Sequence, residues 1–415
     1  MFGRAAKYAV TSPLVALICL AGCAGNAGPP PTAPNGASPV SDRIRTLSSA
    51  TFYVNVAHGS DQNDCKSPQR ACKTIEHAVT ISASGDTIDV AAGLYPENVS
   101  IRHSVRINGA GRDTTIVDGG MHGSEFLIAF TKGVDVTITE MTMRNGSGSG
   151  DGGAIYHCNG ALILEGVVIE ENRVRGAGLN GYGGAMYNCP SSSATIVDST
   201  IRNNSAEVGG AICNGGVLTI IRSTFNGNTA LEARGGGAIF NYGTLHVANS
   251  TFSGNTAAGG IGGAIHNGKL VGLTGGAQID NSTISENNSA LGGAISNMSG
   301  LPIYLQNTII ASNNPQNCAG APVETEGFNL SSDESCDLHG AGDLNGVDAL
   351  LGLLQNNGGS TSTMALLPGS PAIDAGNNSG CRDWVGHLLT TDQRGMPRPD
   401  PHEPRGCDIG AYESQ

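Results

Sequence analysis

Six copies of a short glycine-rich block constrain the fold of this chain more than any other feature. Each block reads Gly-Gly-Ala followed by Ile or Met, and the copies begin at Gly152, Gly183, Gly209, Gly236, Gly262 and Gly292. Successive copies start about 26 residues apart, with two longer intervals, which is the spacing of a structural repeat. Such a period predicts stacked supersecondary units that contact only their neighbours.

Alignment of the six copies gives three columns of apolar residues. The first column closes the glycine-rich block, and the third lies five residues after the second in every copy. The columns are Ile155, Met186, Ile212, Ile239, Ile265 and Ile295; Leu164, Ile196, Ile220, Val247, Ile279 and Leu305; and Ile169, Ile201, Phe225, Phe252, Ile284 and Ile310. Because each copy carries three such positions, we expect three short faces in every turn of the chain.

Two columns of asparagine accompany the apolar columns. The first ladder, three residues after the third apolar column, is Asn172, Asn204, Asn228, Asn255, Asn287 and Asn313. The second ladder follows the glycine-rich block as Asn188, Asn214, Asn241, Asn267 and Asn297, with His157 in its first place. Asn tolerates the left-handed turn conformation, and its amide can bond the equivalent amide one coil above. The glycine pairs suit positions of positive φ or crowded backbone.

A helical solenoid is the competing architecture, and the composition argues against it. The chain has 62 glycines in 415 residues, and its apolar residues occur mostly in short alternating runs such as 244–248, without a 3.6-residue stripe. We therefore predict an all-β, single-stranded parallel β-helix with one coil per repeat and adjacent coils ~4.8 Å apart. The crossover rule predicts a right-handed coil.

The N-terminus has the features of an export signal. Arg4 and Lys7 precede an apolar run, 9–20, that is too short to span a membrane comfortably. The run ends in Leu-Ala-Gly-Cys at Cys23, which resembles the bacterial lipoprotein box and implies cleavage before Cys23 and a lipid on its thiol. An ordinary signal peptide with an incidental cysteine is the alternative. Ala24, which is not Asp, implies the outer membrane in a Gram-negative cell.

The cysteines fit an exported protein, because disulfides persist outside the cytoplasm. Three pairs are close in sequence: Cys65 with Cys72, Cys318 with Cys336, and Cys381 with Cys407. Cys158 and Cys189 occupy one repeat column on consecutive coils, so their Cα atoms should lie ~5 Å apart, within bridging distance. Cys213 is left over, either free and buried or in place of one partner. The pairing is a hypothesis at this point.

The residues before the repeats predict an N-terminal cap. The strand-like run 51–56 precedes Ser67 and Pro68, which favour a helix from there to about Ser82 with the stripe Ala71, Cys72, Ile75, Ala78 and Val79. The segments Asp86-Thr-Ile-Asp-Val, Gly93-Leu-Tyr-Pro-Glu and Thr115-Ile-Val-Asp-Gly then resemble the first coils of the pectin-lyase-like superfamily. That resemblance covers about 73–120 and implies a fold, not a chemistry.

Two further resemblances concern the repeats and the C-terminus. The Gly-Gly-Ala blocks with Phe225-Asn-Gly-Asn and Phe252-Ser-Gly-Asn resemble the repeats of chlamydial polymorphic outer-membrane proteins, which implies surface location and adhesion. Residues 343–413, with Pro-Gly-Ser-Pro-Ala-Ile-Asp-Ala-Gly and Cys-Asp-Ile-Gly-Ala-Tyr-Glu, closely resemble the choice-of-anchor Q domain and predict a loop-rich cap for the last coil. The expected divisions are 1–22 signal peptide, 23–50 flexible tether, 51–120 N-terminal cap and first coils, 121–317 repeat β-helix, and 318–415 C-terminal cap.

An enzyme of the same fold is the main functional alternative, so we looked for convergent acids. In the aligned columns Glu170 meets Arg202, and Glu286 meets Gly254, so neither forms a carboxylate pair. Asp198 meets Arg222. We interpret Glu97 as a turn residue, His157 beside Cys158 as a ladder substitution, and Asp383 with His387 near Trp384 as an ordered cap loop. No catalytic residue, cofactor or metal ligand is predicted.

The two longest loops of the repeats are the candidate ligand-binding surface. Residues 172–182 and 229–235 both precede a glycine-rich block and should project from one edge, two coils or ~10 Å apart. They carry Arg173, Arg175 and Arg234, with Glu232 between, which suggests a shallow site for an acidic glycan; solvated loops are the alternative.

These features predict a lipid-anchored, non-enzymatic protein of the bacterial cell surface. Its long side would present Asn, Ser and Thr for adhesion or for binding carbohydrate or envelope material. The formal charge of −13 and the lack of a basic run argue against a nucleic-acid partner. We expect a monomer held to a membrane by its N-terminal lipid. The alternatives are a polysaccharide lyase or hydrolase and a purely structural spacer.

Overall fold

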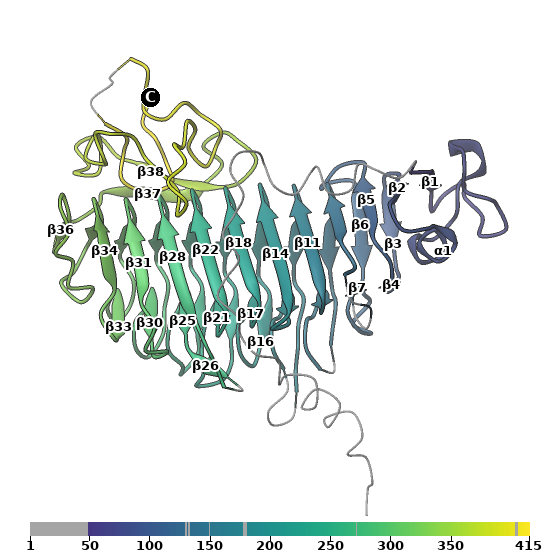
Figure 1. The fold of residues 1–415 in the computed structure, drawn as a ribbon, viewed down its shortest axis with the longest axis horizontal. Coiled ribbons are helices and arrows are strands. Elements are labelled where there is room, and N and C mark those ends of the chain that lie inside the picture. The colour runs from purple at the N-terminus through teal and green to yellow at the C-terminus, as the bar shows by residue number, and fades with distance from the viewer. Residues whose placement is uncertain are drawn as a thin grey trace, which may run out of the picture. The chain divides into compact units, whose positions relative to one another are not determined.

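The computed structural model describes residues 49–128, 131, 133–148, 150–176, 181–270, 272–402 and 406–415. The expected signal peptide, Cys23 and nearly all of the tether lie outside these residues. Within 49–415 the chain winds repeatedly through three sheets, which we call A, B and C, and consecutive strands within each sheet are parallel. Figure 1 shows these strands side by side, from β1 and α1 at one end to β36 at the other. The fold is a parallel β-helix.

Each coil passes through sheet A, sheet B and sheet C in that order. In the described part of the chain, sheet A contains β1 (Thr51–Val54), β2 (Asp86–Val90), β5 (Val105–Gly109), β8 (Val136–Thr139), β11 (Gly160–Glu165), β14 (Ser192–Val197), β18 (Val217–Ile221), β22 (Thr244–Ala248), β28 (Gly276–Asp280), β31 (Ile303–Gln306) and β34 (Glu324–Gly327). Sheet B contains β3 (Gly93–Tyr95), β6 (Thr115–Asp118), β9 (Thr142–Arg144), β12 (Val168–Glu170), β15 (Thr200–Arg202), β19 (Thr224–Asn226), β23 (Thr251–Ser253), β29 (Thr283–Ser285), β32 (Ile309–Ala311), β35 (Leu330–Ser331) and β36 (Leu344–Asn345). Sheet C contains β4 (Val99–Ile101), β7 (Phe126–Ile128), β10 (Ile155–His157), β13 (Met186–Asn188), β17 (Ile212–Asn214), β21 (Ile239–Asn241), β25 (Ile265–Asn267), β30 (Ile295–Asn297) and β33 (Cys318–Gly320).

Smaller sheets lie between and beside these faces. The short strands β16 (Ser205–Ala206), β20 (Thr229–Ala230) and β24 (Thr256–Ala257) pair between sheets B and C. Two antiparallel hairpins are formed by β26 (Lys269–Leu270) with β27 (Leu273–Thr274), and by β37 (Leu351–Gln355) with β38 (Thr363–Leu366).

The three predicted apolar columns are confirmed by the strand registers. Ile155 pairs with Met186 in sheet C, Leu164 with Ile196 in sheet A, and Ile169 with Ile201 in sheet B, and the same registers continue through the later copies. All of these side chains are buried in one continuous core. The core therefore grows by one layer of apolar side chains per coil.

The glycine pair of each repeat has two separate causes. Gly209 has a φ of +65°, which an L side chain rarely adopts. A Cβ on the next residue, Gly210, would lie 2.2 Å from the carbonyl oxygen of Gly237 on the following coil. The first glycine is thus required by its conformation, and the second by the close approach of two backbones.

The predicted left-handed role of the ladder asparagines is wrong. In the first ladder, which follows the strands of sheet B, the residue before each asparagine has the positive φ, for example Glu171, Asn203 and Glu286. That preceding residue makes the bend after the sheet B strand, and the side chain of the asparagine that follows it is buried.

The N-terminal helix is shorter than the sequence predicts. The expected helix from Ser67 to Ser82 is instead a 3₁₀ turn, Pro68–Arg70, and a separate helix α1, Ile75–Ile81. Cys72 between them is extended, because its backbone bonds to Tyr53 and Asn55 beside β1. Helix α1 starts where the side chain of Thr74 accepts a hydrogen bond from His77 N. Its buried face packs against the first coils as the expected cap.

The four expected disulfides are present. They join Cys65 to Cys72, Cys158 to Cys189, Cys318 to Cys336 and Cys381 to Cys407, with Cα–Cα distances of 5.0, 4.9, 4.9 and 6.1 Å. Cys213 is free and buried. The Cys158–Cys189 bridge joins two consecutive coils directly after strands β10 and β13.

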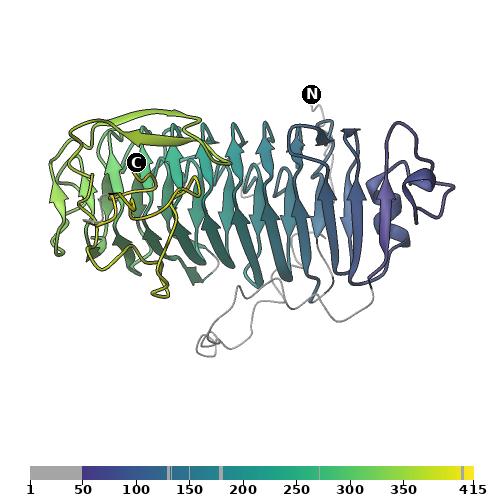
Figure 2. The ribbon, with the colours of Figure 1, turned by 90° about the horizontal axis from the view of Figure 1, so that it is seen from above.

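The C-terminal region does more than the expected capping of the last coil. Residues up to 345 add strands β33 to β36 to the coil stack, but the remainder turns back along its side. Ser362 O accepts a hydrogen bond from Thr224, and Arg382 O accepts one from Asn281, both more than 100 residues away in sequence. Figures 1 and 2 show this green-to-yellow segment over the later coils. We call residues 356–415 the C-terminal strap.

Candidate functional site

The asparagine ladders are internal hydrogen-bond chains. In the first ladder each Nδ2 donates to Oδ1 of the next asparagine at 2.9 to 3.0 Å, from Asn172 to Asn313. The second ladder runs from Asn188 to Asn297 at 2.7 to 3.2 Å. The side chains of both ladders are buried. The predicted bond from each asparagine to the equivalent one on the next coil is therefore confirmed, and these asparagines are not among the residues that the surface can present for adhesion.

His157 begins the second ladder as a neutral imidazole. Burial lowers the pKa of His157 to about 4, although its bond to Asn188 acts in the opposite direction. Nδ1 lies 2.9 Å from Asn188 Oδ1, an acceptor, so Nδ1 carries the proton. The neighbouring Cys158 is in a disulfide, so the two residues do not form a nucleophile and base.

The two long loops meet through Arg234. Its Nη1 donates to the hydroxyl of Tyr182 at 3.2 Å, and its carbonyl oxygen bonds to His266. Arg173 donates to Ser205 Oγ at 3.3 Å, and Arg175 is exposed. The structure thus brings Arg234 to the end of the first loop, whereas Arg173 and Arg175 lie on its earlier part, near β16. Residues 177–180 of that loop lie outside the described residues.

Acidic groups accompany the three arginines. Asp151 Oδ1 accepts hydrogen bonds from the backbone N–H groups of Gly181 and Tyr182 at 3.3 and 3.1 Å, and burial raises the pKa of Asp151. The side chain of Glu207 lies against Gly181, and Glu232 follows in the second loop. The two loops and the turns beside them therefore combine three cationic with three acidic side chains rather than forming a uniformly basic patch.

Aromatic side chains gather on the outer face of sheet C beside these loops. The middle residues of β10, β13, β17 and β21 point outward in register: Tyr156, Tyr187, Cys213 and Phe240. The rings of Tyr156 and Tyr187 are stacked with centroids 5.6 Å apart, and Tyr182 lies 6.2 Å from Tyr187.

A tyrosine from the adjoining turn completes this group. The hydroxyls of Tyr187 and Tyr242 are 3.0 Å apart. We call Tyr156, Tyr182, Tyr187 and Tyr242 the tyrosine cluster. Tyr242 is fully buried, whereas the other three are half-buried. The sequence columns contained Tyr156 and Tyr187 in equivalent positions, which was the signal that sequence reasoning missed.

Cys213 is a free, buried cysteine that packs against this cluster. It packs with Phe240, Tyr242 and Tyr187 in a small apolar group outside the main core. Burial raises the pKa of the Cys213 thiol well above its usual value. The thiol therefore stays protonated at neutral pH, which disfavours nucleophilic or redox chemistry.

The acids considered for catalysis have structural partners. Glu170 pairs with Arg202 at 2.6 Å, and Asp198 pairs with Arg222 at 2.7 Å. Glu97 accepts hydrogen bonds from the backbone N–H groups of Ile75 and Glu76, so it caps the first turn of α1. Burial raises the pKa of Glu97, and these bonds oppose that effect.

The Asp383 loop is likewise held by local bonds. Asp383 Oδ1 accepts from the N–H groups of Val385 and His387, and His387 Nδ1 lies 3.3 Å from Oδ2. Trp384 stacks on His246 of β22 with centroids 5.0 Å apart. These contacts fasten the strap to sheet A.

Asp280 is a buried acid that sequence reasoning did not single out. Burial raises the pKa of Asp280 to about 8, and the charges of Glu326 and Asp383 add to the increase. Gln278 Nε2 donates to Asp280 Oδ1 and to Glu326 Oε2, each at 3.0 Å. Asp280 is fully buried, and the neighbouring Asn281 bonds to Arg382 of the strap, so the Asp280 carboxyl group has no route to a polymeric substrate in this arrangement.

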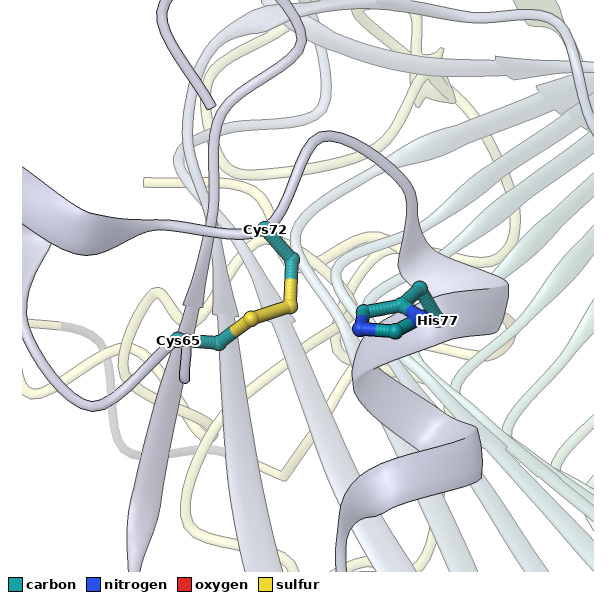
Figure 3. Close-up of side chains that lie close together, drawn as sticks. All are labelled: Cys65, Cys72 and His77. Atoms are coloured by element: carbon teal, nitrogen blue, oxygen red, sulfur yellow. A yellow bond between two sulfur atoms is a disulfide. The ribbon is translucent and has the colours of Figure 1, made fainter. Parts of the chain in front are cut away.

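One compact group of metal-ligand residue types occurs among the described residues. Figure 3 shows Cys65, Cys72 and His77 close together at the start of α1. The two sulfur atoms are joined in a disulfide, however, and a thiolate is the form of cysteine that binds metal. This group therefore stabilises the cap and is not a metal centre.

Comparisons with known proteins agree with the repeat pattern. The family model described as the Chlamydia polymorphic membrane protein repeat matches residues 222–242, which include β19, β20 and β21. No match was found among curated proteins.

Solved structures provide more distant likenesses. Pectate lyase Pel9A is 16% identical with a TM-score of 0.42, and the alignment covers 89% of this chain and 98% of that chain. The complex of XylC with xylose is 10% identical with a TM-score of 0.37, covering 88% and 98%. Identities and TM-scores this low give no information about the activity of this chain.

The described residues contain no helix long and apolar enough to cross a membrane.

Proposed function

We propose that this chain is a lipid-anchored β-helix protein of the bacterial cell surface that binds carbohydrate or another envelope component without catalysis. The repeat match at residues 222–242 supports a surface location. A lipid on Cys23 would hold the chain to a membrane, and residues 23–50 would act as a tether. The choice-of-anchor Q resemblance of the strap fits a surface protein of this kind.

The contact that carries the proposal is the bond between Arg234 and Tyr182. It joins two extended loops from different coils at the margin of an aromatic surface. Loops that project from one edge of a solenoid are common sites of binding. The alternative hypothesis, a polysaccharide lyase or hydrolase, has no comparable support, because the acids described above are engaged in caps, ion pairs or buried contacts.

The test measures binding and product formation together. The whole chain, purified in mild detergent, is applied to immobilised acidic and neutral polysaccharides, and the medium is assayed for reducing and unsaturated sugar ends. We expect retention without products, and weaker retention of Arg234→Ala than of the control Arg70→Ala, whose exposed side chain lies near α1. Released sugar ends would support the enzyme alternative, and lack of retention on every polymer would favour a structural spacer.

A further inference from the structure

We propose that the tyrosine cluster is a binding subsite for an uncharged sugar ring of a neutral glycan. This inference rests on the proposed function of carbohydrate binding and names the chemical class of its ligand. It differs from the acidic glycan predicted from the arginines alone.

The cluster presents aromatic surface on the outer face of sheet C, at strands β10 and β13. Further along this face, Cys213, Phe240 and His266 are buried beneath the adjoining loops. Tyr156 and Tyr187, on the two preceding coils, are half-buried instead. The accessible aromatic surface is therefore a short strip, one or two coils wide, which is comparable to one or two sugar rings.

The half-buried rings are held in place before any ligand arrives. Tyr187 is fixed at its hydroxyl by Tyr242 and along its ring by Tyr156. Tyr182 is fixed at its hydroxyl by Arg234 and at its backbone N–H by Asp151. Few rotamers are then lost on binding, and rigid tyrosines combine apolar contact with hydroxyl hydrogen bonds at low entropic cost.

The charges around the cluster favour a neutral ligand. Arg234 and Asp151 both contact Tyr182, and Glu207 and Glu232 lie on the neighbouring turns. These groups offset the positive charge that would attract a uronic acid. Burial also raises the pKa of Tyr187, so its hydroxyl remains uncharged, and the fully buried Tyr242 holds Tyr187 without contacting a ligand itself. C–H groups of a neutral sugar can pack on the rings while its hydroxyls bond to the phenols.

The experiment compares neutral and acidic oligosaccharides as probes for the whole chain in detergent. Cello-, manno- and galacto-oligosaccharides form the neutral set, and galacturonate and glucuronate oligosaccharides form the acidic set. We expect a neutral probe to bind, and Tyr187→Ala to weaken its affinity ~10-fold, which corresponds to one stacked ring. Tyr156→Ala, which leaves the Tyr187–Tyr242 bond intact, should also weaken it. Tyr187→Phe should retain most of the affinity.

Tyr304→Ala is the matched control, because Tyr304 is a 39% exposed tyrosine on sheet A, away from the cluster. The Tyr304→Ala variant should bind the neutral probe with the affinity of the wild type. Binding of acidic probes alone, lost in Arg234→Ala but not in the tyrosine variants, would overturn this inference while the proposed function stands. Failure of every probe and polymer to bind would overturn both. Concentration-dependent dimerisation abolished by Tyr156→Ala, without sugar binding, would identify the strip as a contact between copies and also overturn the inference.

Discussion

Asn228 occupies the middle of a chain of buried hydrogen bonds. It donates to Asn255 Oδ1 and Ile201 O, each at 2.9 Å, and accepts from the backbone and side-chain nitrogens of Asn204. Asn228→Ala would remove the hydrogen bonds that its side chain makes to the backbone N–H of Asn204 and to the carbonyl oxygen of Ile201, at about 1 to 3 kcal/mol each. We expect the free energy of unfolding, measured by urea denaturation, to fall by ~3 kcal/mol or more.

Asn226→Ala is the control for that measurement, because Asn226 is a half-buried asparagine two residues earlier that makes one bond to Ser253 O. Its effect should be below ~1.5 kcal/mol. Equal losses in the two variants would contradict the view that the internal ladder, rather than asparagine in general, holds the coils together.

Asp280 makes stability depend on pH. The ordinary pKa of Asp is 3.8, whereas Asp280 retains its proton in the folded chain up to about pH 8. Between these values the folded state binds more protons than the unfolded state, so its contribution to stability falls as pH rises from about 4 to 8. Asp280→Asn should remove this fall and be more stable than wild type at pH 8 by ~1 to 3 kcal/mol.

The comparison needs unfolding curves at pH 5 and pH 8, with the exposed Asp113→Asn as control. If Asp280→Asn keeps the wild-type difference between the two pH values, Asp280 does not carry that proton.

The strands that recur in every repeat could be predicted from the sequence. The elements that occur once and pair with a segment outside the repeats could not. Ile155, Leu164 and Ile169 recur in every copy, so their register followed from alignment. The helix start was wrong because Ser67 and Pro68 carry a local helix signal, yet the backbone of β1 pairs with Cys72. The right-handed sense of the coil stays a prediction from the crossover rule.

The candidate site was also predicted only in part: the features that the repeat pattern shows were predicted, and the contacts between distant residues were not. The two loops were predicted from their extra length, and their contact through Arg234 is a feature of the folded chain. The position of Asp151 near Arg234 could not be predicted, because the aligned columns do not show which loop residues meet. The burial of Asp280 could not be predicted either, because it lies where the C-terminal strap contacts sheet A. The column Ser199, Ser223 and Ser250 is visible in the sequence as a repeated Ser-Thr, but the repeat does not show that each Oγ accepts a backbone N–H bond from the preceding coil.

The strap is where the whole molecule departs from a simple stack of coils. Gln393 is buried against Thr224 and Thr251 of sheet B, and Ala411 N donates to Thr283 Oγ1. These contacts cover outward-facing threonines that a solenoid would otherwise expose. Each coil still packs mainly on its neighbours, so the strap can be weakened without removing the core beneath it.

Arg398 is the residue on which this attachment most depends. Its guanidinium group is buried and bonds to Glu413 Oε2 at 2.8 Å, Asn249 Oδ1 at 2.8 Å and Gly410 O at 2.7 Å. Arg398→Ala leaves the buried Glu413 carboxylate uncompensated, at a cost of about 3 to 5 kcal/mol. We expect faster amide hydrogen exchange and proteolysis in residues 356–415, while β10 to β21 keep their protection. Arg202→Ala, which breaks the half-exposed pair with Glu170, should change neither. Uniform loss of protection along the coils would instead mean that the strap and the β-helix unfold as one unit.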